Sequence, residues 1–247
     1  EKGLPYQRPP LSKAYLKTGE AEKLALRPES FFDRQSISLR AGTWVDAIDR
    51  SAKDVQIGDE RVPYDHLILA TGTRNIVPPI PGVERTLGLR TLGDARVLRA
   101  ELSMPRKIAV IGGGFIGLEF AAVARLLGHV VSVAEAAPRL MARVVSPAMS
   151  ERFAVMHQDL GTDLHMGAGV AEVTDDGTTL ANGTKIDADL VLLAAGVRPN
   201  VELAKAAGLK VANGIVTDAL MRTEDPAIFA LGDCAVFPDP RTGRPVR

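Results

Sequence analysis

The fold is decided by residues 107–119, which read Lys-Ile-Ala-Val-Ile-Gly-Gly-Gly-Phe-Ile-Gly-Leu-Glu. An apolar run of strand length enters a turn with glycine at positions 112, 114 and 117, and a helix-forming sequence follows. A second apolar run, Val130–Ala134, ends at the acidic residue Glu135. The order strand, glycine-rich turn, helix, strand and acid predicts a βαβ unit with a parallel sheet.

Each glycine of this turn suits a different steric demand. Gly112 permits a tight turn, Gly114 lets the backbone approach a pyrophosphate, and Gly117 allows close packing of helix on strand. The helix N-terminus offers N–H groups and a partial positive charge to the phosphates. Glu135 can accept hydrogen bonds from the adenine ribose. We therefore predict a dinucleotide site that also includes Ile116; the alternative is a glycine-rich turn in an ordinary α/β sheet.

Composition narrows the classes of partner. Lys plus Arg and Asp plus Glu number 30 each, so net charge gives no argument for nucleic acid or an anionic membrane, and we expect neither as a partner. The longest apolar runs are about as long as a strand, and none is expected to span a bilayer. The single cysteine, Cys234, excludes a disulfide framework, a CxxC redox pair and an iron–sulfur ligand set within this chain. A reducing, cytoplasmic compartment fits. No metal site is expected, because none of the four histidines has metal-ligand spacing: His66, His129, His157 and His165.

The chain repeats one pattern. Short alternating runs between Ile37 and Tyr64 predict a small antiparallel meander, and the strand His66–Gly72 follows. A second meander is predicted around a turn at Asn182-Gly183, and the strand Asp189–Gly196 follows. Two duplicated nucleotide-binding folds account for this pattern. A further buried strand is expected in Ala227–Asp233, a helix over Thr91–Ser103, and a short helix capped by Ser12 and ended by Gly19.

Only the second of these two folds contains a glycine-rich turn after its first strand. The chain opens at Glu1 without methionine and closes in Arg-Thr-Gly-Arg-Pro-Val-Arg247, which resembles the middle of a hairpin. We therefore expect a fragment of a longer protein, with the first glycine-rich entry preceding Glu1.

Several strings together resemble a known family: residues 4–16 (Leu-Pro-Tyr-Gln-Arg-Pro-Pro-Leu-Ser-Lys-Ala-Tyr-Leu), Ala70-Thr-Gly72, 89–94 (Leu-Arg-Thr-Leu-Gly-Asp), the glycine fingerprint with Leu118-Glu119, 135–140 (Glu-Ala-Ala-Pro-Arg-Leu), 195–200 (Ala-Gly-Val-Arg-Pro-Asn) and 230–235 (Ala-Leu-Gly-Asp-Cys-Ala). The set resembles the ferredoxin reductase branch, putidaredoxin-reductase-like, of the two-dinucleotide-binding flavoproteins. The resemblance covers essentially the whole chain.

This resemblance implies an α/β fold with two Rossmann-like, three-layer dinucleotide-binding domains. The NAD domain is inserted in the FAD domain, and each has a small antiparallel meander. Residues 1–104 are expected to begin the FAD domain, residues 105–218 to form the NAD domain, and residues 219–247 to return to the FAD domain. The family's first fingerprint and its C-terminal domain lie outside this sequence, so the fragment is expected to hold FAD weakly or not at all.

The resemblance also implies an activity. Such proteins pass hydride from NADH to FAD, then single electrons to a [2Fe–2S] ferredoxin that serves a monooxygenase or dioxygenase; a monomer or weak dimer is expected. One alternative is an NADH oxidase, an apoptosis-inducing-factor-like protein or a nitrite-reductase-type relative on the same fold. Another is a non-catalytic NAD-binding module. A disulfide reductase is excluded because it needs a cysteine pair.

The family match assigns two catalytic residues. Lys13 is expected near the flavin ring, where a cation stabilises the anionic reduced flavin. Glu119 is expected to pair with this lysine. The alternatives are an exposed helix lysine and an acid in the first helical turn that complements the macrodipole.

The remaining assignments concern cofactor binding. Arg8 and Arg90 match arginines that contact FAD, where surface arginine is the alternative. Val45 is expected to meet the FAD adenine through its backbone, and the alternative is a valine in the core of the meander. Thr71 and Gly72 are expected to close a turn against the cofactor, where a plain strand-end turn is the alternative, and Asp233 is expected to bind the ribityl chain. An Asx-turn is the alternative for Asp233.

Residues 195–197, with Gly196 at their centre, are expected to form the floor of the nicotinamide site. Arg139 and Arg143 flank Glu135 and raise the question of NADP. We predict NAD, because Glu135 would repel a 2′-phosphate.

Overall fold

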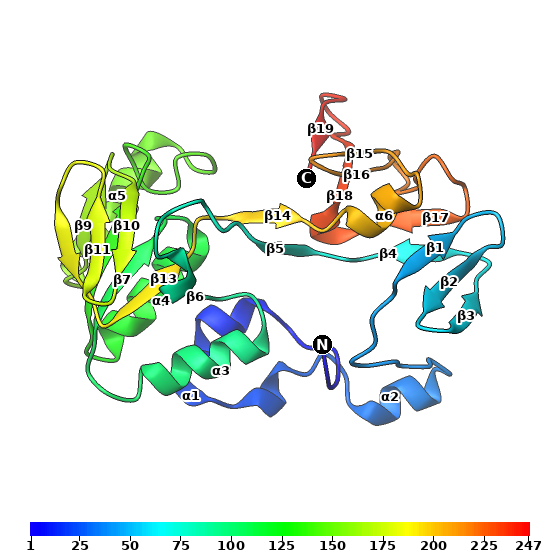
Figure 1. Ribbon diagram of the computed structural model, residues 1–247, viewed down its shortest axis with the longest axis horizontal. Helices are drawn as coiled ribbons and strands as arrows, with labels where there is room; N and C mark the ends of the chain where they lie inside the picture. The colour runs from blue at the N-terminus through cyan, green and yellow to red at the C-terminus, as the bar shows by residue number, and fades with distance from the viewer. The chain divides into compact units, whose positions relative to one another are not determined.

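The computed structural model describes residues 1–247. The chain forms two compact units, each built from separate segments (Figure 1). Unit 1 consists of Glu1–Leu4, Glu29–Arg74 and Val197–Arg247. Unit 2 consists of Pro5–Pro28 and Asn75–Gly196.

The limits of these units differ from the domain boundaries expected after residues 104 and 218. Pro5–Pro28 and residues 75–104 belong to unit 2, because their apolar side chains join the core beside its sheet. Residues 197–218 belong to unit 1, because Leu209 and Ile215 join its core. Hydrophobic packing therefore groups these segments differently from the order of the motifs along the chain, on which the expected boundaries were based.

Unit 2 is built around a five-stranded parallel sheet in the order β6-β13-β7-β8-β9. The strands are β6 (Leu87–Gly88), β7 (Lys107–Ile111), β8 (Val130–Glu135), β9 (Asp163–Met166) and β13 (Leu190–Leu193). Two helices, α4 (Phe115–Leu126) and α5 (Pro147–Asp159), connect β7 to β8 and β8 to β9. Parallel neighbours require such crossovers, and the predicted Rossmann-like fold is confirmed here.

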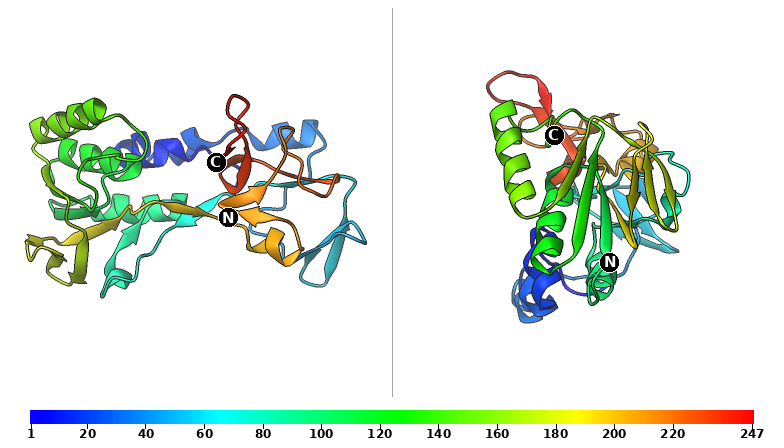
Figure 2. Two further views of the ribbon diagram at one scale, coloured as in Figure 1. Left: turned by 90° about the horizontal axis from the view of Figure 1, so that it is seen from above. Right: turned by 90° about the vertical axis from the view of Figure 1, so that its left-hand side faces the viewer.

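The central strands of this sheet are buried on both faces. Ile108 and Val110 of β7 join the core that contains α4, whereas Ala109 and Ile111 join a second core under the meander. This alternation follows from the two-residue period of a strand. In the right-hand view of Figure 2 the helices and the meander lie on opposite sides of the sheet. Unit 2 therefore has three layers.

The meander of unit 2 consists of three strands: β10 (Val170–Thr174), β11 (Gly177–Leu180) and β12 (Lys185–Asp187). The predicted turn at Asn182-Gly183 joins β11 to β12, and Gly183 has φ +85°. The Asn182 side chain accepts a hydrogen bond from Thr184 N at 3.0 Å.

Short helices pack beside the helix layer of unit 2. They are η1 (Pro9–Ser12), α1 (Ala14–Thr18), η2 (Ala21–Leu24) and α3 (Leu92–Glu101). A further short helix, η3 (Val83–Arg85), contacts β10 of the meander. Thr91 and Asp94 form a capping box at the start of α3, within the helix predicted over Thr91–Ser103. The capping role predicted for Ser12 is wrong, because its hydroxyl donates to Glu119 instead. Gly19 ends α1 in the left-handed conformation, as predicted.

Unit 1 contains its own meander and a pair of parallel strands. Its core gathers Ile48, Leu69, Ile215 and Ile228. Its elements are β1 (Ala47–Asp49), β2 (Asp54–Ile57), β3 (Glu60–Pro63), β4 (Leu67–Leu69) paired with β17 (Ile228–Ala230), the sheet β15 (Val211–Ala212), β16 (Gly214–Val216), β18 (Ala235–Pro238) and β19 (Pro245–Val246), the pair β5 (Thr73–Asn75) and β14 (Val197–Pro199), and α2 (Glu29–Arg34), α6 (Glu202–Ala206) and η4 (Gly232–Cys234).

The first meander is shorter than predicted. Strand structure expected for residues 38–40 and 43–46 is absent, and β1 begins only at Ala47. These residues are mostly exposed, so alternation in the sequence was not matched by a buried face. No helix of the structure combines the length and apolar character that crossing a membrane would require.

A buried histidine makes the stability of unit 2 sensitive to acid. Burial lowers the pKa of His129 below its ordinary value of 6.5, and the positive charge of Arg106 adds to this effect. The unfolded imidazole takes up a proton near its ordinary pKa, and the folded one only at lower pH. We therefore expect the free energy of unfolding to fall as pH drops below about 6.5.

Urea unfolding at about pH 7.5 and about pH 5.5 checks this expectation. His129→Gln should lose less stability between the two pH values than the unmodified chain, whereas the exposed control His66→Gln should behave as the unmodified chain does. Burial also lowers the pKa of His157, so part of the acid sensitivity should remain. An equal loss in the His129→Gln variant would contradict this account.

Candidate functional site

The glycine-rich turn between β7 and α4 has two glycines fixed by the protein and one beside open space. Gly112 has φ +109°, and a Cβ there would lie 2.5 Å from the carbonyl oxygen of Ala194. A Cβ on Gly117 would lie 2.1 Å from the carbonyl oxygen of Gly112. Gly114, in contrast, has extended backbone, and nothing lies within 4 Å of the position of its Cβ. The space beside Gly114 can therefore admit a ligand.

The N-terminus of α4 faces this space without a side-chain cap. Gly114 is the N-cap residue, and its missing side chain offers no acceptor to the helix. The N–H groups of the first turn have no acceptor within a helix. Phe115 is exposed and Ile116 half-buried at this end. Together with the helix dipole, these N–H groups form a position suited to an anion such as a pyrophosphate.

Glu135, at the end of β8, holds the turn and the following loop together. One carboxylate oxygen accepts a hydrogen bond from Gly113 N at 2.7 Å. The other accepts from Ala137 N, also at 2.7 Å. Sequence reasoning placed Glu135 beside the glycine turn but missed this bracing contact. Its binding of a ribose stays a prediction.

The two arginines that follow Glu135 have different surroundings. Arg139 is half-buried and donates hydrogen bonds to its own loop and to Ser150. Arg143 is exposed, and its guanidinium lies 3.6 Å from the Cβ position of Gly196. The structure therefore brings Arg143 and Gly196 together, while Arg139 is already occupied by protein acceptors.

Lys13 and Glu119 form the predicted ion pair. The Lys13 ammonium lies 2.9 Å from Oε1 of Glu119, and the two side chains are 52% and 29% exposed. The other oxygen of Glu119 accepts a hydrogen bond from the Ser12 hydroxyl at 2.5 Å. Glu119 is the fifth residue of α4, beyond its first turn, so the alternative of a first-turn acid complementing the helix dipole is wrong. Ser12 is a contributor that sequence reasoning missed.

Arg8 and Arg90 are also brought together. The Arg8 guanidinium donates to the carbonyl oxygen of Arg90 at 2.6 Å and lies over the ring of Tyr6, 5.5 Å from its centroid. The Arg90 N–H donates to Asp94, the N3 residue of the capping box of α3, at 2.9 Å. The backbone at Arg90 is thus held from two sides.

In unit 1 three predicted residues follow the carboxyl ends of paired strands. Thr71 and Gly72 follow β4, Asp233 follows β17, and these strands are parallel, so their ends meet at one edge. The Thr71 hydroxyl donates to the carbonyl oxygen of Asn200 at 2.6 Å, and the Asn200 amide donates back to the Thr71 carbonyl at 2.8 Å. Asn200 was not among the predicted site residues, although its string carried the resemblance. Val45 lies half-buried before β1, outside the strands of the meander, and its contact with FAD stays a prediction.

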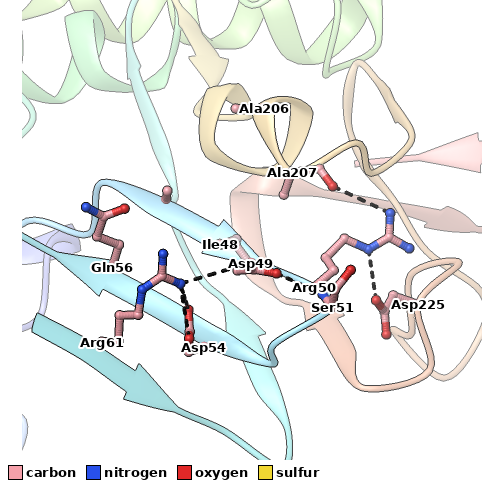
Figure 3. Close-up of a pocket in the computed structure, with 11 residues that line it drawn as sticks. Ile48, Asp49, Arg50, Ser51, Asp54, Gln56, Arg61, Ala206, Ala207 and Asp225 are labelled. Carbon is pink, nitrogen blue, oxygen red and sulfur yellow. Dashed lines mark hydrogen bonds and ion pairs between the residues drawn. The ribbon is translucent and has the colours of Figure 1, made fainter.

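A cavity of about 690 Å³ lies in unit 1, and none of the predicted site residues lines it (Figure 3). Its arginines are already paired with carboxylates. Arg50 contacts Asp225 at 2.9 Å, and Arg61 contacts Asp54 at 3.0 Å and Asp49 at 3.6 Å. Both guanidinium groups of this lining are therefore engaged by aspartates of the lining itself, and we assign the cavity no function.

Comparison with known proteins gives one consistent result. A family model described as pyridine nucleotide-disulphide oxidoreductase matches residues 1–245. Rhodocoxin reductase of Rhodococcus erythropolis is 47% identical over 97% of this chain and 58% of its own length. The ferredoxin--NAD(+) reductase component of the anthranilate 1,2-dioxygenase system of Burkholderia cepacia is 43% identical over 100% of this chain and 63% of its own length.

A solved structure agrees with these sequence matches. The ferredoxin reductase for the CYP199A2 system from Rhodopseudomonas palustris superposes with a TM-score of 0.97 at 45% identity. The match covers 100% of this chain and 63% of that chain. The chain therefore spans less than two thirds of the length of each of these three proteins.

Proposed function

The chain belongs to the pyridine nucleotide-disulphide oxidoreductase family, and from this premise we propose that it is part of an NADH-dependent flavoprotein reductase with a [2Fe–2S] ferredoxin as electron acceptor. The ferredoxin would serve a monooxygenase or dioxygenase. The names of two similar proteins support this proposal, because they are reductases of ferredoxins and one name specifies NAD(+). In this activity, the proposed role of this chain is the binding of the two dinucleotides.

The observation that carries the proposal is the cradle at the N-terminus of α4. Gly114 borders open space, α4 has no side-chain cap, and Glu135 stands beside the turn. These features fit a dinucleotide pyrophosphate with its ribose toward Glu135. We therefore assign NADH to Gly112, Gly114, Ile116, Gly117 and Glu135, with Arg143 and Gly196 beside them.

The remaining candidates are proposed as contacts of FAD. As implied by the family resemblance, they are Arg8, Lys13, Arg90, Val45, Thr71, Gly72 and Asp233. The donors and acceptors fit this role, since guanidinium and ammonium groups bind phosphate or a reduced ring, and strand-end residues line nucleotide clefts. When bound, FAD would supply the chemistry of accepting a hydride and releasing electrons singly.

The residues of this chain would then orient the bound dinucleotides and stabilise negative charge on them. Glu119 fixes the position of the Lys13 ammonium, which is half exposed and so available to a ligand. The positive charge of Lys13 would favour an anionic group in front of it. No side chain is assigned the role of general acid or base, because hydride transfer needs neither.

Disulfide chemistry is not part of this proposal, although the family name includes it. Cys234 is the only cysteine of the chain. It is buried, and its thiol donates to the carbonyl oxygens of Leu69 and Leu231 at 3.4 and 3.2 Å. A second thiol for exchange is missing from these residues. We further propose a cytoplasmic location, since NADH and reduced thiols belong to that compartment. We also propose a monomeric or weakly dimeric state.

The experiment begins with fluorescence titration of the purified chain with NADH. It continues with an assay of NADH oxidation that contains FAD, with and without a [2Fe–2S] ferredoxin. We expect saturable NADH binding in preference to FAD, and at most a slow oxidation at saturating FAD that ferredoxin accelerates. Oxidation that ferredoxin does not accelerate would favour an NADH oxidase, and NADH binding with no oxidation even at saturating FAD would favour a non-catalytic NAD-binding module. Absence of NADH binding would refute the proposal.

Loss of the Lys13–Glu119 pair is expected to slow electron delivery but not NADH binding. Lys13→Met removes the cation, and Glu119→Gln leaves it without its partner. We expect each change to slow ferredoxin reduction at saturating FAD by about tenfold, because one preorganised charge is lost or misplaced. The double variant should be no slower than Lys13→Met alone, since the two residues act as one unit. Lys17→Met, which alters another exposed lysine of α1, should have no effect. If the double variant lost the sum of the two single effects, Lys13 and Glu119 would act independently and the prediction would be wrong.

A further inference from the structure

The loop between β8 and α5 is fastened to the glycine turn by its backbone. Met141 N donates to the carbonyl oxygen of Gly113 at 3.0 Å. Met141 is buried and holds a φ of +47°, a conformation uncommon for residues other than glycine. Leu140 is also buried, and its side chain lies 2.6 Å from the position that a Cβ on Gly113 would take. The loop therefore holds the carbonyl oxygen of Gly113, while Glu135 holds its N–H.

One guanidinium holds this loop in place. Arg139 donates to the carbonyl oxygen of Ala142 at 2.6 Å and to that of Val145 at 2.9 Å. It also donates to the Ser150 hydroxyl at 2.7 Å. The hydroxyl in turn donates to the carbonyl oxygen of Leu140 at 2.5 Å. Arg139 thus occupies the Ser150 acceptor lone pair and directs its proton to Leu140.

From this geometry we infer that Arg139, acting through Ser150, is a positioning residue for the dinucleotide site, an inference that rests on the function proposed above. It touches no atom of the glycine turn itself. It fixes the backbone on both sides of Arg143 and presses Leu140 and Met141 against Gly113. The turn can then present its N–H groups to a pyrophosphate in one arrangement, which reduces the ordering cost of binding.

Arg139 and Arg143 differ in how they can act on a ligand. Both arginines lie in the loop after Glu135, and from the sequence either could contact a dinucleotide phosphate. The guanidinium of Arg139 is occupied by the carbonyl oxygens of its loop and by Ser150. Arg143 is exposed beside Gly196. Arg139 therefore acts on the ligand through the backbone, and only Arg143 is free to act on it directly.

The test compares Arg139→Met with a matched control, Arg125→Met. Arg125 also donates to backbone carbonyl oxygens, those of His129 and Leu160, but it lies near the C-terminal end of α4. That end is about 15 Å from the glycine turn, at 1.5 Å per residue. Both variants lose comparable hydrogen bonds, so a merely structural effect should appear in both.

We expect Arg139→Met to weaken NADH binding about 10-fold to 100-fold. Removing a residue that holds a direct ligand of a metal ion in place has an effect of that size, and Arg139 holds the glycine turn in the same indirect way. Arg125→Met should bind NADH as the unmodified chain does. Ser150→Ala should also weaken binding, and the double variant Arg139→Met/Ser150→Ala should be no weaker than Arg139→Met, because the two residues form one chain of hydrogen bonds. Arg139→Lys, which keeps one donor group, should bind with intermediate affinity.

A second readout does not depend on NADH. Amide hydrogen exchange of the chain without ligand should be faster at Gly113 and Met141 in Arg139→Met, and unchanged there in Arg125→Met. If the unmodified chain failed to bind NADH, the proposed function would fall, and exchange would still decide whether Arg139 holds the turn. If NADH binds and Arg139→Met binds it within twofold of the unmodified chain, the inference is wrong. Equal weakening in Arg125→Met would likewise overturn it, as would loss of binding in Arg139→Met with normal affinity in both Ser150→Ala and Arg139→Lys.

Discussion

Replacing Gly114 by valine is expected to weaken NADH binding by more than about 100-fold while leaving the chain folded, since misplacement of a bound group by an ångström has effects of that size. Gly114 has φ −86° and ψ −174°, which any residue adopts, and its Cβ would meet no atom within 4 Å. A side chain there therefore costs the protein little. It fills the space beside the N–H groups of α4 that we assign to the pyrophosphate.

Gly117 provides the opposite case in the same turn. A Cβ there would lie 2.1 Å from the backbone oxygen of Gly112, and no flexible side chain can move aside to relieve the clash. Gly117→Ala should therefore lower the free energy of unfolding by about 1–3 kcal/mol or more, the usual cost of overpacking. Gly114→Val should change it by less than about 1 kcal/mol.

Urea unfolding and NADH titration of both variants test this contrast. Gly114→Ala should lie between the unmodified chain and Gly114→Val in NADH affinity. If Gly114→Val keeps its stability and also binds NADH normally, the open space beside Gly114 holds no pyrophosphate. The turn would then be an ordinary connection in an α/β sheet.

The sequence predicted the βαβ unit of unit 2 well because its signals are local. Gly117 is required by its close contact with Gly112, five residues earlier in the chain, and the apolar runs of β7 and β8 match strands buried on both faces. Such contacts depend on sequence spacing. The predicted pairing of Lys13 with Glu119 came from family resemblance instead, because no periodicity relates residues that far apart.

Features that depend on distant packing were missed. The grouping of Pro5–Pro28 with unit 2 follows from side chains such as Leu11 and Leu16 in its core, and the sequence does not say which sheet they cover. The sequence predicts a helix cap at Ser12 because serine often is one, but its hydroxyl donates to the Glu119 carboxylate of α4. Asn200 and Arg139 act through backbone carbonyl oxygens, which carry no sequence signal at all.

The bracing role of Glu135 changes what its replacement should do. Glu135→Ala removes the acceptor of both Gly113 N and Ala137 N, so the turn loses support as well as a ribose partner. Affinity for NADH and NADPH should both respond to the lost support. The ratio of the two affinities isolates the charge, because only NADPH carries the 2′-phosphate that a carboxylate repels.

We therefore expect Glu135→Ala to shift the NADH-to-NADPH ratio of affinities toward NADPH by about tenfold, and Glu135→Arg by more, since a guanidinium attracts the phosphate. Glu135→Gln is the better control for the hydrogen bonds that Glu135 accepts from Gly113 N and Ala137 N. Its amide oxygen can still accept from Gly113 N, but its NH2 group faces the Ala137 N–H, so support is weakened while the charge is also removed.

Arg143 is the residue that could attract the 2′-phosphate of NADPH once the carboxylate of Glu135 has been removed. It is exposed and lies on the loop that Glu135 braces, beside Gly196. Adding Arg143→Ala to Glu135→Ala should cancel most of the gain for NADPH, because the attraction is lost along with the repulsion. The measurement is a pair of fluorescence titrations, with NADH and with NADPH, for each variant. A ratio unchanged in Glu135→Ala and Glu135→Arg, with both affinities reduced equally, would mean that Glu135 acts only as a brace of the glycine turn. The preference for NADH would then have to come from another residue of the site.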